Sequence, residues 1–244
     1  MSDWIHTFQS LDSNSYDHAL ERWQQTHSKA WLVAALRHAA STTPGIDDLI
    51  VASAALPPAD PAFETAAFYR LSLLSDGTSK AELRAELDRI LALTLPKSSV
   101  NLFRGLRMRN APTLAEFLSF AARRPLMLTY DANTEERPDE DYLEHRIAER
   151  ASGKDLLDRD SIKILNEQAP QQTLREIVFS NGIPDYHRSD VLISVFTRAL
   201  LLADEDTSVP LARLLRAAGA DRSGYLRTYL ATPKGAARHR AGTY

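Results

Sequence analysis

Residues 68–76 read Phe-Tyr-Arg-Leu-Ser-Leu-Leu-Ser-Asp, and residues 196–204 repeat the pattern as Phe-Thr-Arg-Ala-Leu-Leu-Leu-Ala-Asp. The phenylalanine, the arginine, two leucines and the aspartate coincide. Each copy lies on an apolar-periodic segment that is followed by a Thr-Ser pair and a second leucine-rich segment. The pattern therefore predicts a helix-turn-helix unit that is used twice, with the shared leucines in the core of each helix pair.

Helix signals also dominate the rest of the 244 residues. The run Asp12-Ser13-Asn14 offers an N-cap, the Ser79/Glu82 and Thr113/Glu116 pairs are typical capping boxes, and successive prolines or Gly-Pro steps mark helix ends. About twelve helices follow from these signals, with little or no strand. We therefore expect an all-α protein built as an α-solenoid or as stacked helical hairpins.

The chain is predicted to form two helical lobes. An N-terminal lobe at 1–124 and a C-terminal lobe at 139–231 are joined by a polar connector at 125–138 that begins and ends with proline. The segment 232–244 is small, basic and aperiodic, so it is predicted to be a disordered tail. One continuous helical domain at 12–231 stays open as the alternative.

Two successive predicted helices within residues 13–44 carry aromatic, large, small and proline residues at regular positions, namely Tyr16, Trp23, Leu36, Ala39 and Pro44. This segment resembles a degenerate tetratricopeptide repeat (TPR). It departs from that family at Leu20 and Leu32, where the family has small residues. With a weaker match at 60–96, the resemblance covers about a third of the chain. It implies a concave helical surface that binds a protein or peptide, with no catalytic residues to carry over.

Composition excludes several classes of site. The absence of cysteine excludes disulfides, thiolate zinc sites and iron–sulfur clusters, and nine glycines without a glycine-rich loop argue against a Rossmann or P-loop fold. Asp141, His145 and Glu149 follow one helical spacing, but interleaved arginines favour a solvated charged face over a metal site. We therefore expect no cofactor and no metal.

The chain shows neither an N-terminal leader nor an apolar window long enough for a membrane span. We therefore expect a cytoplasmic protein. A periplasmic location, or a domain of a larger exported protein, stays open.

Charge is segregated along the chain although its net value is only −3. Residues 97–124 carry six bases and one acid, whereas residues 131–160 carry eleven acids and five bases. Neighbouring blocks of opposite sign are expected to pair with each other or to be solvated. A nucleic-acid partner is therefore not expected, and a nucleic-acid-associated module using 97–124 is the weakest reading of function.

Arg70 and Arg198 occupy the same place in the two motif copies, so they are the first candidate binding residues. Each either covers a core edge with its aliphatic stem or lines a groove and takes a carboxylate from a bound peptide. The remaining candidates are an exposed aromatic side chain near the N-terminus and two basic residues of the 97–124 block: Trp4, Arg104 and Arg107.

The sequence favours a non-enzymatic scaffold that binds a protein or peptide in a groove between stacked helix pairs. The alternative is an all-helical, hydrolase-like enzyme in which acids of 131–160 meet His145 or His187. Such a dyad is assembled in space, so the sequence leaves this alternative open, and catalytic residues stay unassigned.

Overall fold

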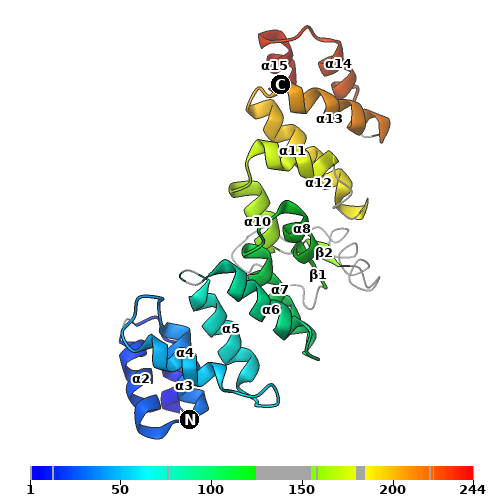
Figure 1. Ribbon diagram of the computed structural model, residues 1–244. Coiled ribbons are helices and arrows are strands. Elements are labelled where there is room, and N and C mark those ends of the chain that lie inside the picture. Colours follow the sequence, from blue (N-terminus) through cyan, green and yellow to red (C-terminus); the bar gives the residue numbers. More distant parts are fainter. Residues whose placement is uncertain are drawn as a thin grey trace. The chain divides into compact units, whose positions relative to one another are not determined.

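The computed structural model describes residues 2–12, 14–75, 77, 79–124, 155–157, 159–179, 185–219, 221 and 223–243. Its described part is mostly helical, with fourteen helices and one pair of two-residue strands, so the all-α expectation is confirmed. The chain divides into two compact units, Met1–Ala111 and Pro112–Tyr244 (Figure 1).

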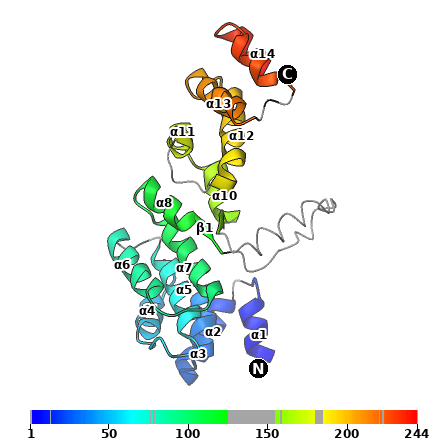
Figure 2. The same cartoon turned by 90° about the vertical axis from the view of Figure 1, so that its right-hand side faces the viewer.

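Helices joined by turns and loops make up the described residues of the first unit, which contain no strand. Successive helices contact one another, and α3 and α5 each also contact helices further along the chain (Figure 2). Its helices are α1 (Ser2–Gln9), α2 (Ser15–Thr26), α3 (Lys29–His38), α4 (Ile46–Ala54), α5 (Phe63–Leu74), α6 (Lys80–Leu91) and α7 (Lys97–Arg109). The sequence patterns do not predict α1.

Helix α5 joins two apolar clusters in the first unit. Ala66 belongs to the cluster built with α2, α3 and α4, whereas Phe63, Ala67 and Leu71 belong to the cluster built with α6 and α7. A helix with apolar residues on several faces is stable only when it is surrounded. Burial on both sides of α5 therefore ties the helices of this unit into one body.

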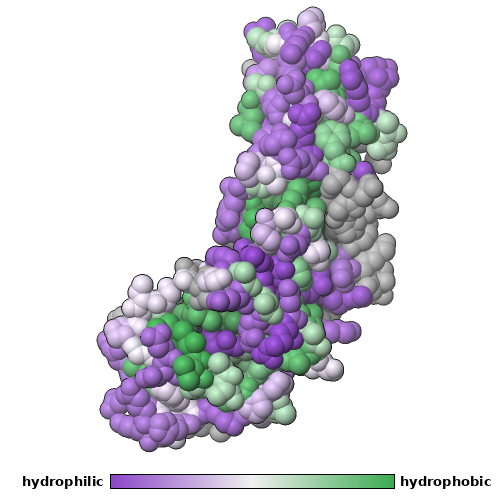
Figure 3. All heavy atoms as spheres, viewed as in Figure 1, coloured by the Kyte–Doolittle hydropathy of each residue, from purple (hydrophilic) through white to green (hydrophobic). Residues whose placement is uncertain are grey.

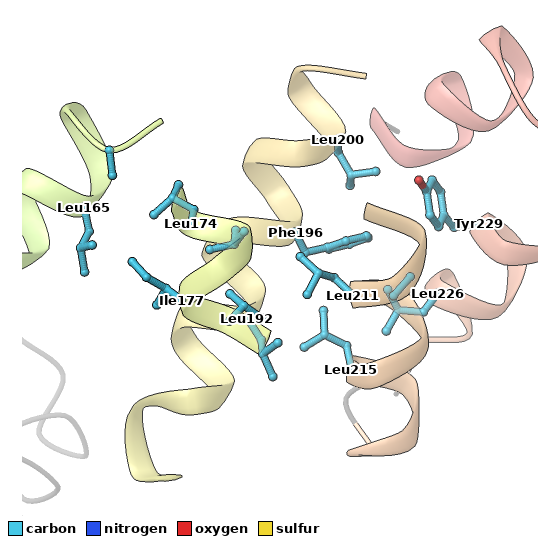
Figure 4. Packing of buried hydrophobic residues seen from close by; sticks show 14 residues of the cluster. Leu165, Leu174, Ile177, Leu192, Phe196, Leu200, Leu211, Leu215, Leu226 and Tyr229 are labelled. Atoms are coloured by element: carbon cyan, nitrogen blue, oxygen red, sulfur yellow. The ribbon is translucent and has the colours of Figure 1, made fainter. Parts of the chain in front are cut away.

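The second unit contains seven described helices and a short antiparallel strand pair in which Ala122 lies opposite Leu157. Its elements are α8 (Leu114–Ala121), β1 (Ala122–Arg123), β2 (Leu156–Leu157), α10 (Arg159–Glu167), α11 (Gln171–Phe179), α12 (Asp185–Leu201), α13 (Glu205–Ala217), α14 (Tyr225–Ala231) and α15 (Ala236–Thr243). Figure 4 shows its core, in which Phe196 of α12 lies among leucines of α11, α13 and α14 and meets Tyr229 edge-to-face.

The boundary between the units lies earlier than the sequence predicts. Helix α8 was expected in the N-terminal lobe, but Leu114, Phe117 and Leu118 pack against the core of the second unit. The unit therefore begins at Pro112 and not after residue 124. The predicted connector at 125–138 lies outside the described residues.

The prediction of a disordered tail is wrong for Ala236–Thr243, which forms α15 and packs on α12 and α14. Glu205 holds the start of this helix, because its carboxylate accepts from the Gly235 backbone at 2.6 Å and pairs with Arg238 at 3.0 Å. Gly242 allows the close approach of the helix end to Tyr229. Tertiary contacts therefore order a segment that shows no helical periodicity.

The two copies of the repeated motif lie in different environments. The prediction that the shared leucines are buried is wrong for Leu201 and Leu202, which are 70% and 58% exposed. Asp204, the last residue of the second copy, is the N-cap of α13 and accepts a hydrogen bond from Thr207 N at 3.1 Å. Asp76, its counterpart, lies outside the described residues.

Of the three predicted N-terminal caps, one forms a side-chain hydrogen bond. Thr113 accepts a hydrogen bond from Glu116 N at 3.2 Å and so caps α8 as expected. Ser79 stands at the N-cap of α6 and Asn14 at the N-cap of α2, but neither side chain makes a capping hydrogen bond. The segment that Gly105 interrupts forms the regular helix α7 over Lys97–Arg109, in which that glycine is buried.

In the view of Figure 3, hydrophilic residues cover much of each unit, and an apolar area lies where Figure 1 places α4. Val51 of α4 is 69% exposed. None of the helices in the described ranges is both long and apolar enough to cross a membrane.

Replacing Ala203 with glycine is expected to stabilise the second unit by about 1 kcal/mol. Ala203 ends α12 with φ of 54°, a left-handed conformation that disfavours a Cβ, while Asp204 N donates to Ala199 O at 2.9 Å as in a glycine-capped helix. Urea unfolding measures the change. As the control, Ala199→Gly within the buried helix is expected to destabilise by a similar amount, and equal effects of both variants would contradict this account.

Gly242→Val is expected to release α15 from α12 and α14. A Cβ at this position would lie 2.7 Å from Leu200 Cδ2 and 3.2 Å from Tyr229 Cε2, so the larger side chain has no room. Hydrogen exchange of the amides of residues 236–243 should become faster, whereas Ala236→Val at an exposed position of α15 should leave it unchanged. Slow exchange in both variants would show that α15 does not depend on this close approach.

Candidate functional site

Two of the predicted binding arginines are buried ion-pair partners inside the first unit. Arg70 is 7% exposed, and its Nη2 donates to Glu86 Oε1 of α6 at 3.0 Å. Arg107 is 6% exposed, and its Nε donates to Asp88 Oδ1 of α6 at 2.8 Å. Both guanidinium groups therefore connect neighbouring helices, and neither is presented at the surface to a ligand.

Glu86 accepts hydrogen bonds from two arginines. Two of these bonds come from Arg89, at 2.8 and 2.7 Å. The hydrogen bonds from Arg89 and then from Arg70 hold the pKa of Glu86 below its usual value, although burial opposes the shift. Glu86 is therefore charged at neutral pH and balances the buried Arg70.

The other predicted arginines are also engaged in the fold. Arg198 is half-buried on α12, where its Nη1 donates to the carbonyl of Asn166, near the end of α10, at 3.4 Å. A cation near the last carbonyls of a helix is favourable because of the helix dipole. Arg104 is half-buried on α7. Arg70 lies in the first unit and Arg198 in the second, and their different partners give the two motif copies different structural roles.

Three of the six bases in the block at 97–124 form ion pairs within the described part of the fold. Within the second unit, Arg123 is 6% exposed and pairs with Asp160 at 2.5 Å, and Arg124 pairs with Asp155 at 3.2 Å. With Arg107 also buried, these charges do not form an open basic stripe of the kind that follows a phosphate backbone. The charge blocks meet each other here, as their opposite signs indicate.

The carboxylate and histidine site of the enzymatic alternative lies mostly outside the described residues. This holds for residues 131–150, including Asp141, His145 and Glu149, and for the side chain of His187. Across the part of the chain that the structure describes, no group of three or more histidine, aspartate or glutamate side chains could hold a metal ion.

Trp4, which the sequence predicts to be an exposed side chain near the N-terminus, lies on α1. It is half-buried, and its Nε1 donates to the Ala30 carbonyl at 2.7 Å. Its ring stacks on Phe8 with centroids 5.1 Å apart, and Phe8 in turn meets the edge of Tyr69 at 6.5 Å. These three rings form an aromatic shelf that joins α1 to α5.

A pocket of about 390 Å³ opens in the first unit beside this shelf. The α1–α2 loop, the start of α2, the last turn of α3 and the middle of α5 form its walls. Its lining residues are Ser10, Leu11, Asp12, Tyr16, Arg37, His38 and Tyr69. This volume lies at the lower end of the range typical of ligand pockets.

Arg37 is the one arginine among the lining residues of this pocket. Its guanidinium carbon lies 4.6 Å from the centroid of the Phe8 ring, and its Nη1 donates to the Tyr69 hydroxyl at 3.1 Å. The side chain is exposed and has no carboxylate partner among the described residues. An aromatic ring under one face and a hydroxyl at one nitrogen hold this cation in place without neutralising it.

The remaining polar groups of the pocket are fixed by backbone contacts. His38 Nε2 lies 2.8 Å from the Thr7 carbonyl oxygen. Because a carbonyl oxygen only accepts, this ring nitrogen carries a hydrogen and donates it. Tyr16 donates to the Pro44 carbonyl at 2.7 Å, and burial, with a smaller contribution from Asp17, raises the pKa of its hydroxyl. The pocket wall is therefore preorganised.

Sequence reasoning missed Arg37, His38 and Tyr69. Arg37 and His38 read as ordinary cations in the last turn of a helix, and Tyr69 lies beside the repeated arginine without being shared by the second copy. These residues meet only because α3 packs on both α1 and α5. A residue pattern along one helix therefore cannot predict that these side chains lie together.

Comparison with protein-family models, curated proteins and solved structures finds no match to this chain.

Glu86→Ala is expected to destabilise the first unit by about 3 kcal/mol, because it leaves the buried Arg70 without its carboxylate. Urea unfolding provides the measurement, with Glu82→Ala on an exposed position of α6 as a control that should cost less than about 1 kcal/mol. Adding Arg70→Met to Glu86→Ala should recover part of the loss. If the double variant is no more stable than Glu86→Ala, the uncompensated charge is not the cause.

Proposed function

We propose that this protein is a non-enzymatic scaffold that binds a protein or peptide partner on stacked helix pairs arranged as an α-solenoid. The helix contacts support this arrangement. In the first unit α2 packs on α3, α3 on α5 and α6 on α7, and in the second unit α11, α12, α13 and α14 pack successively. Helices that bury one face against their neighbours in the sequence leave extended surfaces for a ligand.

The resemblance to tetratricopeptide repeats agrees with this proposal. Its best-matched segment forms the pair α2 and α3, and the two aromatic positions, Tyr16 and Trp23, both lie on α2. The tyrosine hydroxyl binds the carbonyl of Pro44, the proline at the family's closing position. A helix pair of this kind serves as a binding surface in that family.

The single observation that carries the proposal is the pocket beside Arg37. It is preorganised, it lies within one compact unit, and it presents a cation that the fold itself does not use in an ion pair among the described residues. Buried arginines elsewhere in the unit all have acidic partners where their contacts are described. Because an aromatic ring already orders this exposed cation, a ligand can pair with it at a smaller cost in side-chain entropy.

Selection from a displayed peptide library against the full chain tests the proposal. Enriched peptides should bind the native chain and lose at least about tenfold in affinity when Ser10→Trp fills the pocket. Ser98→Trp, at an exposed position of α7 outside the pocket, is the matched control and should retain binding. The proposal fails if no peptide is enriched over a blank surface, or if the two tryptophan variants bind equally.

A further inference from the structure

We propose that the pocket beside Arg37 binds a carboxylate, carried by an aspartate or glutamate side chain of an extended partner segment. This inference rests on the proposed function and adds the chemical class of the residue that is bound. It follows from the geometry of the arginine, the hydrogen-bonding capacity of the wall and the charge balance of the pocket.

Only part of the N–H donors of the planar Arg37 guanidinium is engaged in a hydrogen bond with a described residue. Phe8 covers one face of it, and one nitrogen donates to Tyr69, so the remaining N–H groups lie in the guanidinium plane without a partner among the described residues. A planar fork of N–H donors matches the two oxygens of a carboxylate. Because the ring stack already orders the side chain, binding costs less rotamer entropy than for a free arginine.

Two hydroxyl groups beside Arg37 are also able to donate. The Tyr69 oxygen accepts from Arg37 at 3.1 Å, and the Ser10 oxygen accepts from the Asp12 backbone N–H at 2.9 Å. Each hydroxyl oxygen accepts one hydrogen bond in that contact, and its own hydrogen can be donated to a ligand. The wall next to the cation therefore offers donors, which an oxyanion satisfies and a cation does not.

The charge balance distinguishes a carboxylate from a phosphate. Asp12 is the one carboxylate among the lining residues, and its Oδ1 accepts from Asn14 N at 2.9 Å at the start of α2. The pocket thus holds one guanidinium and one acid that is already bound to backbone. The single guanidinium charge compensates a carboxylate but only part of a phosphate charge near two, and Asp12 would repel the phosphate more strongly.

Three peptide arrays with identical flanking sequences and Glu, Gln or Lys at the central position test the inference. The full native chain should bind members of the Glu array at least about tenfold more tightly than the matched Gln peptides, and the Lys peptides more weakly still. For the peptides that bind, fluorescence anisotropy then compares Arg37→Gln with Arg37→Lys. The glutamine variant should lose the Glu preference, and the lysine variant, which keeps charge without the fork, should retain part of it.

Lys97→Gln removes the same charge from an exposed position of α7 and is the control. It should bind as the native chain does, and thermal melting should show that all three variants are folded. Equal binding of Glu and Gln peptides, or an unchanged preference in Arg37→Gln, would overturn the carboxylate assignment while peptide binding stands. If no array binds the native chain, the proposed function fails together with it.

Discussion

A guanidinium that leaves water must keep a carboxylate beside it, and the first unit depends on this constraint. Helix α6 supplies two acids, Glu86 and Asp88, that are two positions apart and so point to different sides of the helix. Glu86 pairs with Arg70 of α5, and Asp88 pairs with Arg107 of α7. Sliding or rotating α6 would break both pairs at once, so the acids set its register between its two neighbours.

The same constraint separates arginines that hold the fold from one that is available to a ligand. Arg70, Arg107 and Arg123 are buried and paired, whereas Arg37 is exposed and rests on an aromatic ring. Removing a buried partner is costly for stability, but an exposed arginine can change with little effect on folding. The proposed ligand recognition therefore uses a different arginine from those that stabilise the fold.

Helices with clear caps and apolar periodicity were predictable, and α2, α3 and α8 lie close to where these signals place them. The failures have physical causes. Helices α1 and α15 have weak local signals and are ordered by packing, through Trp4 on the Ala30 carbonyl in one case and through Gly242 in the other. Repetition of Arg70 as Arg198 suggested a shared role, but burial and partners differ between the copies because different helices surround them.

The helical character of the protein follows from the sequence alone, since capping residues, prolines and the 3.6-residue apolar period act within a single helix. Which charged groups form ion pairs and which line the pocket depends on the packing of the helices. The pocket joins Arg37 of α3, Tyr69 of α5 and Ser10 after α1, which are up to 59 residues apart in the chain. Their meeting depends on how α3 packs between the other two helices, and no local pattern along the chain encodes that packing.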